Sequence, residues 1–260
     1  IALIISALKQ ANISYSPATI RRAIENTAKP FDSISPHAGG YGLLQVSNAI
    51  SYLKQWKSAD DHQLRYCVRV NNTERGIYLR NGVNTLHGKP VEKRITLQPI
   101  FHPDTPNQHK VEYQTTFDLV CDADWVDAPQ HLVLCNSTGA FKVTVDTGKC
   151  LPNSLNYTEV LGFDSKYPRE RGPIFRVPIT VCRPIQLDGD NDGTFETSAI
   201  AFNNQSPTSK HDKRIHRYFL SVPSGASWAS FNLKCTHAKM PTIIAFHAVQ
   251  VDKVKKISEV

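Results

Sequence analysis

Residues 111–119 read Val111-Glu112-Tyr113-Gln114-Thr115-Thr116-Phe117-Asp118-Leu119. Bulky or apolar side chains stand at the odd positions of this run, and polar ones at the even positions. A period of two is typical of a strand with one face buried and one in solvent, as in an antiparallel sheet. Similar short runs return at residues 131–134, 141–145, 157–163 and 174–181, separated by Pro, Gly, Asn and Asp. This spacing predicts a β-sandwich.

The sandwich region extends from about residue 58 to residue 184. From Pro184 to about Gly193 the chain is polar, and strand-like runs begin again at residues 215–222, 228–233 and 243–251. We expect residues 185–260 to start a further β-sandwich or jelly-roll-like unit. We also expect that unit to be incomplete, because about four strands are too few for a sandwich.

The first residues carry a helical pattern instead of a strand pattern. Apolar side chains recur at spacings of three and four in Ile1, Ile4, Ile5 and Leu8, which predicts a helix ending near Gln10. The longest apolar run, residues 1–8, is far shorter than the ~20 residues needed to span a bilayer. We therefore expect no membrane partner. Because the chain opens inside this pattern without a Met, we expect it to be cut from a longer polypeptide.

Two more helices are predicted before residue 57. Ser16-Pro17 combines an N-cap residue with a proline at the first helical position, and this helix should continue to about Ala28. The apolar run 43–46 follows a glycine-rich turn and predicts a short strand. Ser47 should then cap a last helix. The chain as a whole is expected to be of mixed α and β class.

Charge and cysteine content narrow the classes of function. Lys and Arg number 30 and Asp and Glu 23, a net charge of +7, but acidic residues are interleaved with the basic ones. Such a surface gives no basic patch, so we expect no nucleic-acid partner. The six cysteines form no Cys-x-x-Cys pair, which favours reduced thiols in a cytoplasmic protein.

The helical segments contain, in order, the runs Ala2-Leu3-Ile4-Ile5-Ser6, Pro17 with Ile20-Arg21-Arg22-Ala23-Ile24-Glu25-Asn26-Thr27-Ala28, Gly40-Tyr41-Gly42-Leu43-Leu44-Gln45-Val46, and Ala49. In order and spacing these runs resemble the C-terminal part of subtilisin-like serine peptidases. In that family the nucleophilic serine opens a buried helix. A capped helix, a Gly-x-Gly turn, a short apolar strand and an alanine-containing helix follow it. The resemblance implies that residues 1–57 are the C-terminal end of a subtilisin-like α/β domain.

A more specific signal lies in residues 71–80, residues 172–180, residues 221–229 and Phe246-His247-Ala248-Val249-Gln250. These runs resemble stretches of one branch of that class, the tripeptidyl peptidase II family of large serine exopeptidases. The similarity covers essentially the whole chain. The resemblance implies a parent enzyme that removes tripeptides from the free N-terminus of oligopeptides through an acyl-enzyme, and that self-associates into a large homo-oligomer.

We expect no catalytic residue, cofactor or metal ligand in this chain. By the resemblance, the serine lies roughly three helical turns before Ile1, and the acid and histidine of the triad precede it. His87-Gly88 and Asp146-Thr147-Gly148 imitate motifs of the class, but they follow the helix remnant and stand in the wrong order. We interpret residues 143–148 as a strand followed by a turn, and neither motif as catalytic.

Two further patterns resemble metal-binding sites but lack essential ligands. The run Asp188-Gly189-Asp190-Asn191-Asp192-Gly193 spaces its oxygens like a calcium loop, but Ala199 stands where an EF-hand needs its bidentate glutamate. We read the run as a linker. The histidines include no His-x-x-x-His pair, so His216, His237 and His247 are read as ordinary strand residues.

Two hypotheses for function follow. In the first, the chain is a non-catalytic part of a cytoplasmic serine-type tripeptidyl peptidase, inactive by itself, whose substrates are peptides. Residues 1–57 would support the serine-bearing helix, and the β region would provide scaffold and assembly surface. In the second, the chain is a self-standing β-sandwich interaction module with no link to proteolysis. The apolar faces of the helices count against the second hypothesis, because a linker would leave them exposed.

Overall fold

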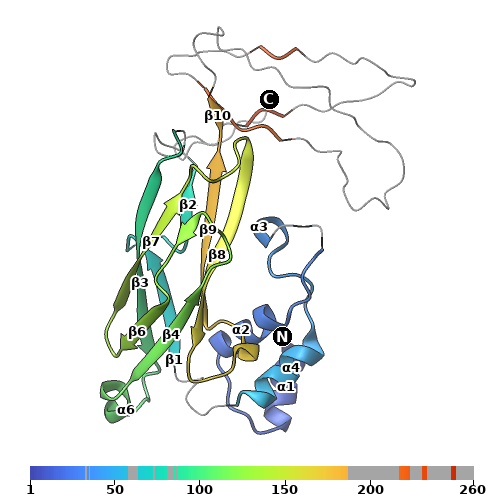
Figure 1. The fold of residues 1–260 in the computed structure, drawn as a ribbon. Helices are drawn as coiled ribbons and strands as arrows, with labels where there is room; N and C mark the ends of the chain where they lie inside the picture. Colours follow the sequence, from blue (N-terminus) through green and yellow to red (C-terminus); the bar gives the residue numbers. More distant parts are fainter. Residues whose placement is uncertain are drawn as a thin grey trace, which may run out of the picture.

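The computed structural model describes residues 1–32, 34, 36–57, 64–72, 74–80, 85, 87–186, 217–222, 230–232 and 247–249. Its largest part is a sandwich of two β-sheets, and helices lie beside one face of it (Figure 1). Mixed α and β content with mainly antiparallel sheets is as the sequence predicted. None of the helices in the described part of the chain combines the length and the apolar character that a membrane span requires.

The sheets contain four and five strands. The first has the order β1 (Leu64–Val70), β3 (Pro90–Phe101), β7 (Gly139–Asp146) and β5 (Val126–Asp127). The second has the order β2 (Ile77–Leu79), β9 (Phe175–Arg183), β8 (Ser154–Asp164), β4 (Gln114–Val120) and β6 (His131–Cys135). Neighbouring strands run antiparallel except β2 and β9, which are parallel.

The period of two in β4 is confirmed by its burial. Thr115, Phe117 and Leu119 are buried, and the residues between them are not. The strand begins later than the sequence pattern did, since Val111 ends the short helix α6 (Asn107–Val111) and is 72% exposed. The sequence predicted β6, β7, β8 and β9 close to their observed bounds, but it did not identify β1, β2 or β3 individually.

The core of the sandwich lies between the two sheets. Aromatic rings occupy its centre, because Phe117 meets Tyr66 and Phe175 edge to face at centroid distances of 5.3 and 5.2 Å. Gly162 of β8 lies directly over the Phe175 ring, and a Cβ there would overlap ring atoms. The position therefore requires glycine because of space. The buried members of this core are Val70, Ile77, Leu79, Ile95, Leu97, Phe117, Leu119, Leu132, Leu134, Phe141, Val143, Val145, Cys150, Val160, Phe175, Val177, Ile179 and Val181.

Residues 1–57 form what we call the helical unit. Its main helices are α1 (Ala2–Gln10), α2 (Pro17–Thr27) and α4 (Val46–Gln55), and the short α3 (Pro36–Gly39) lies between the last two. They pack around a small core of their own, formed by Ile4, Leu8, Ile20, Ala23, Ala49, Tyr52 and Leu53. Ile4 and Leu8 are fully buried as their spacing predicted, while Ile1 is 72% exposed.

Local signals at the helix ends were partly correct. Ser16 caps α2 through a capping box with Thr19, whose backbone N–H lies 3.2 Å from the serine hydroxyl. The predicted strand at 43–46 is wrong, since Leu43 makes only an isolated bridge to Lys29. Ser47 does not cap the last helix either, because α4 begins at Val46 with Gln45 as its N-cap.

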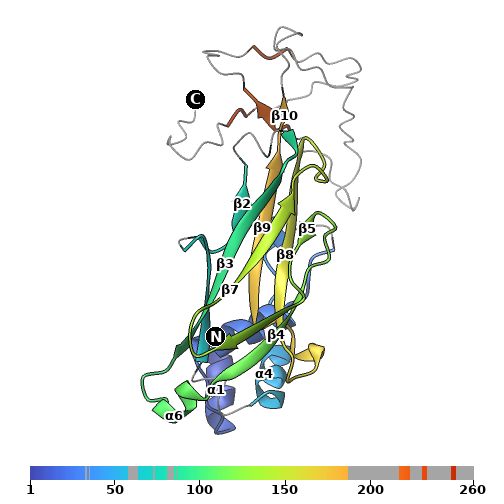
Figure 2. The same cartoon turned by 60° about the vertical axis from the view of Figure 1, so that its left-hand side comes forward.

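The two views place the helical unit at one end of the sandwich, beside β8 and β9 of the second sheet (Figures 1 and 2). At the opposite end, β10 (Ile185–Gln186) pairs in parallel with β11 (Leu220–Ser221). The remaining strand-like runs after residue 222 lie almost entirely outside the described residues, as does the 188–193 loop. The predicted third unit therefore stays a prediction.

Candidate functional site at the helix–sandwich interface

Arg176 of β9 joins the sandwich to the helical unit. Its Nη1 donates to Oε2 of Glu159 on β8 at 3.0 Å, and its Nη2 donates to Oδ1 of Asn26 on α2 at 3.0 Å. Its guanidinium carbon also lies 4.5 Å from the centre of the Tyr41 ring. The side chains of Arg176 and Glu159 are only 18% and 11% exposed. A charged pair removed from water to this extent is sensitive to the loss of either partner.

Asn26 also binds the turn that precedes β9. Its Nδ2 donates to the carbonyl oxygens of Arg171 and Pro173, each at 3.1 Å. Between these two residues Gly172 adopts a φ of +75°, a conformation that favours glycine. A Cβ at Gly172 would lie 2.5 Å from Nδ2 of Asn26. Both the backbone conformation and the space therefore require glycine.

Two tyrosines complete the environment of Glu159. Tyr157 and Tyr41 donate their hydroxyls to Oε1 at 2.5 and 3.2 Å. Burial raises the pKa of Tyr41 to about 12, with a further increase from the negative charge of Glu159 and a decrease from Arg176. Burial is also the largest cause of the raised pKa of Tyr157, followed by its hydrogen bond to Glu159. We call Asn26, Tyr41, Tyr157, Glu159 and Arg176 the Arg176 cluster.

Glu25 lies at the border of the Arg176 cluster. Burial raises the pKa of its carboxyl, while the charges of Arg21 and Arg176 lower it. Its Oε1 forms an ion pair with Nε of Arg21 at 3.2 Å, one turn earlier on the same helix. Arg176 therefore carries an ion pair with Glu159 of the sandwich and also lowers the pKa of Glu25 in the helical unit through its charge.

A second contact between the two units lies near the end of α4. The ring of Trp56 meets Tyr167 edge to face at 6.2 Å. Tyr167 lies under the guanidinium of Arg171, 3.9 Å from its carbon, and Arg171 is 2% exposed with Asp164 3.8 Å from its Nη1. Here too a buried arginine of the sandwich faces an aromatic side chain.

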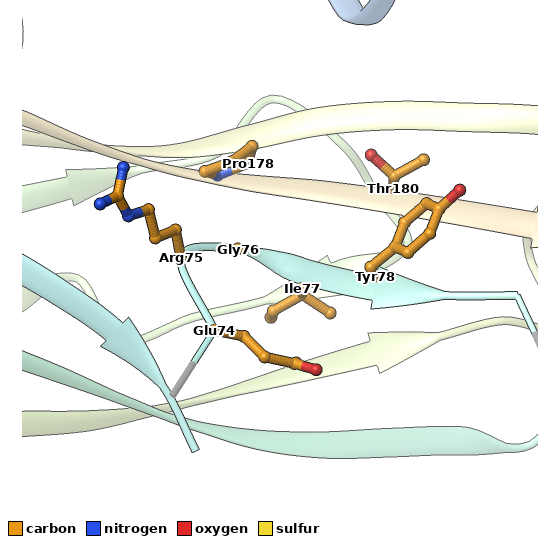
Figure 3. A pocket seen from close by; sticks show the side chains of 7 residues that line it. All are labelled: Glu74, Arg75, Gly76, Ile77, Tyr78, Pro178 and Thr180. Carbon is orange, nitrogen blue, oxygen red and sulfur yellow. The ribbon is translucent and has the colours of Figure 1, made fainter. Parts of the chain in front are cut away.

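The described residues include a pocket at the edge of the second sheet, where β2 meets β9 (Figure 3). Its volume is about 330 Å³, and it is shallow and widely open. Tyr78, Pro178 and Thr180 project to one side of the sheet in Figure 3, whereas Ile77 points to the other. The lining is completed by Glu74, Arg75 and Gly76. With a mostly apolar wall and no enclosing side, the pocket has no arrangement of groups that suits catalysis.

The motifs that imitate a peptidase do lie together in space. Asp146 pairs with Pro90 across β3 and β7, and a Cβ at Gly88 would lie 2.9 Å from Cα of Gly148. However, Oδ1 of Asp146 accepts the N–H of Gly148 at 3.0 Å, and the Thr147 hydroxyl donates to the carbonyl of Lys89. Among the described residues, no hydrogen bond or ion pair joins His87 to Asp146. The carboxylate is engaged in its own turn.

Folding also assembles a serine, a histidine and an aspartate that sequence reasoning missed. Oδ1 of Asp118 lies 3.0 Å from Nδ1 of His131 and accepts the hydroxyl of Ser165 at 2.9 Å. The Ser165 hydrogen bond is the largest cause of the lowered pKa of Asp118. A nucleophilic serine needs its hydroxyl on the imidazole rather than on the carboxylate. This group therefore ties β4, β6 and the end of β8 together and has no catalytic geometry.

Metal ligation was not expected from the sequence. No group of three or more His, Cys, Asp and Glu side chains suited to a metal ion occurs within the described residues. His216, His237, Ala199 and the run 188–193 fall outside them, while His247 is exposed. The five cysteines that the structure describes are free thiols.

Comparison with known proteins identifies the family of this chain. Residues 64–182 match the family model of the first Ig-like domain of tripeptidyl-peptidase II. Tripeptidyl-peptidase 2 of Oryza sativa subsp. japonica is 35% identical over 98% of this chain, and that of Arabidopsis thaliana is 36% identical over 90%. The chain belongs to the tripeptidyl-peptidase II family. The family resemblance seen in the sequence is thereby confirmed.

A solved structure agrees with the sequence relatives. The crystal structure of a tripeptidyl peptidase 2 superposes with a TM-score of 0.65 at 34% identity, covering 72% of this chain and 15% of that one. The Drosophila melanogaster relative is 32% identical over 91% of this chain. The chain spans 18% of the Oryza relative and 16% of the Drosophila one. It therefore matches less than a fifth of each relative's length.

The Arg176 cluster itself was missed by sequence reasoning. Asn26 and Arg176 lie 150 positions apart, so no local pattern connects them. Arg176 and Glu159 both lie in runs predicted as strands. A charged residue between apolar neighbours in a strand faces away from the core. This pattern predicts the face on which each side chain lies, but it does not predict which residue of the helical unit it meets.

Proposed function

We propose that this chain is a non-catalytic supporting part of a serine-type, subtilisin-like tripeptidyl peptidase. In this proposal the whole enzyme acts in the cytoplasm and releases tripeptides from the free N-terminus of oligopeptide substrates. The names of the relatives support a peptidase, and the resemblance of residues 1–57 to subtilisin-like enzymes supports the serine type. The chain alone would then be inactive.

The observation that carries the supporting role is the pair of fully buried side chains on α1. Ile4 and Leu8 pack into the core of the helical unit with none of their surface exposed. In the proposed enzyme, α1 continues the helix that begins at the nucleophilic serine. Its packing would therefore fix where that serine stands, and a misplacement of about 1 Å can cost ~100-fold in rate.

Exposed apolar side chains favour this proposal over a self-standing interaction module. The helical unit leaves six large ones in solvent, namely Ile1, Leu3, Phe31, Ile34, Leu43 and Leu44. Where such side chains form one contiguous face, they are typical of a surface that another part of a protein covers. The remainder of a peptidase domain would cover it. The sandwich would in turn provide scaffold and an assembly surface for self-association into a large homo-oligomer.

The test uses the full-length peptidase that contains this segment, with Ile4→Ala or Leu8→Ala. Each substitution should destabilise by ~2–5 kcal/mol through the cavity it leaves. It should also lower turnover per active site, counted by titration with a covalent serine-directed inhibitor. Lys9→Ala, at an exposed position of the same helix, is the control and should leave both quantities unchanged. Full turnover per titrated site in both cavity variants would contradict the supporting role.

A further inference from the structure

The helical unit and the sandwich have separate apolar cores. Within the described residues, the buried members of one core run from Ile4 to Leu53 and those of the other from Val70 to Val181, with no residue in common. Apolar burial is itself non-directional, and the two cores have no buried residue in common through which to fix an angle. The orientation of one unit on the other must therefore be fixed largely by the hydrogen bonds and ring contacts between them.

Besides the bonds of Asn26 to the Arg171 and Pro173 carbonyls and the ring contact of Trp56 with Tyr167, two of those contacts come from Arg176. Its planar guanidinium points one nitrogen to Glu159, within its own sheet, and the other to Asn26, on α2. The Tyr41 ring, also from the helical unit, lies 4.5 Å from its carbon. Charge-assisted hydrogen bonds from a rigid fork define angles as well as distances. We propose that Arg176 is a positioning residue that sets the orientation of the helical unit on the sandwich.

The geometry also explains why an arginine is needed at this position. Glu159, held by Arg176 and by two tyrosine hydroxyls, anchors one side of the fork. Asn26 anchors the other side, and its Nδ2 is in turn fixed by two backbone carbonyls of the sandwich. A lysine would keep the positive charge beside Glu159 but has one nitrogen, which cannot serve both anchors in these directions. Charge alone should therefore not restore the orientation.

The test on the chain itself uses fluorine NMR with 5-fluorotryptophan. Trp56 reports the interface through its contact with Tyr167, and Trp125 reports the sandwich, because it packs against that core. Single Trp→Phe substitutions assign the resonances of these two residues and of Trp228. We expect Arg176→Lys and Asn26→Ala each to shift or broaden the Trp56 resonance and to leave Trp125 in place. The double variant should change Trp56 less than the sum of the two single changes, because both substitutions remove the Arg176–Asn26 hydrogen bond, while Asn26→Ala also releases the Arg171 and Pro173 carbonyls.

A matched control removes a charge pair elsewhere. Lys142 and Glu92 form an ion pair of 3.2 Å across β7 and β3, in the sheet away from the helices. Lys142→Ala should leave both resonances unchanged. Two outcomes would overturn the inference: an unchanged Trp56 in both interface variants, or a Trp125 that moves together with Trp56. The second would mean that Arg176 stabilises the sandwich instead of orienting the helices.

A kinetic measurement connects the inference to catalysis, and this part rests on the proposed function. In the full-length peptidase, Arg176→Lys should lower kcat at least ~10-fold per titrated active site and change KM less than about twofold, because a displaced helix misplaces the reacting groups more than it weakens binding. If Trp56 responds while kcat stays intact, the orienting role of Arg176 holds and the proposed support of catalysis fails. If Trp56 does not respond, the inference itself fails whatever the kinetics.

Discussion

Asn26 and Arg176 bridge the two units of this protein with a hydrogen bond of 3.0 Å, although 150 positions separate them in the sequence. The same asparagine holds the turn at Gly172 through its other side-chain atom. One polar side chain on α2 therefore contacts both the strand and the turn that leads into it.

Gly172→Ala should destabilise the protein more than Gly40→Ala. Both glycines have a positive φ, +75° and +62°, and Gly172 combines it with a ψ of 174°, a region that essentially only glycine adopts and that costs another residue on the order of 1–3 kcal/mol. Only at Gly172 does the new Cβ also meet the Asn26 side chain, while Gly40 has open space. Chemical denaturation should give an additional loss of ~1–3 kcal/mol at Gly172. Equal losses at the two sites would mean that the turn does not press on Asn26.

Gly162→Ala should be among the most damaging small changes in the sandwich. The added methyl group would overlap the Phe175 ring, which in turn packs on Phe117. We expect a loss near the upper end of the ~1–3 kcal/mol typical of overpacking. Phe175→Leu in the same chain should recover part of this loss, so the two substitutions should be non-additive in urea unfolding. Additive losses would show that the ring has room to move aside.

Ionisation of Tyr41 should reduce stability in alkaline solution. Its pKa is about 12 in the folded protein, against about 10 in an unfolded chain, chiefly because of burial and then because of Glu159. The neutral form is favoured by folding, so the contribution is complete below pH 10 and is lost as the pH rises towards 12. The difference in unfolding free energy between the wild type and Tyr41→Phe should therefore change across this interval.

The same pKa tests the influence of Glu159. Glu159→Gln removes the charge but keeps the side chain's shape, so the pKa of Tyr41 should fall towards 10 without reaching it, because burial remains the larger cause. NMR titration of ring-labelled tyrosine, assigned with Tyr41→Phe, measures the shift. An unchanged Tyr41 pKa would mean that the two groups are further apart in solution than the 3.2 Å of their hydrogen bond.

The chain alone should release no tripeptide from a chromogenic substrate with a free N-terminus. The carboxylate of Asp146 is occupied by the Gly148 N–H, and the Thr147 hydroxyl by Lys89. His87→Ala and Asp146→Asn should therefore leave the baseline unchanged. Turnover that disappears with either substitution would identify a catalytic centre that this geometry does not suggest.

The sequence predicted best where the signal is local. The Ser16-Pro17 start of α2 depends on atoms within one turn, and the structure has the capping box with Thr19. The apolar run at 43–46 failed because a strand also needs a partner. Leu43 finds only Lys29, and Leu43 and Leu44 stay 58% and 44% exposed. The run 43–46 is apolar, but it lacks a strand partner and its two leucines are exposed, so the predicted strand does not form.

The interface could not be predicted in this way, because its partners come from distant elements. Asn26 was part of a helix pattern and Arg176 part of a strand pattern, and both patterns were correct. Neither specifies which helix face meets which sheet face. The positive φ of Gly172 is likewise invisible in a sequence where glycines also serve ordinary turns. Only the folded arrangement brings the side chains together.

Pro178, which lines the open pocket, also bears on how the edge strand β2 can pair with another chain. Proline has no amide hydrogen to offer a neighbouring strand, and pairing between β9 and β2 begins one residue later, at Ile179 and Ile77. Pairing of the edge strand β2 therefore starts no earlier than Ile77, and the strand has three residues. A long, regular edge would be a template onto which a strand from another molecule could add. At high protein concentration, this short edge leaves little backbone for such unwanted growth.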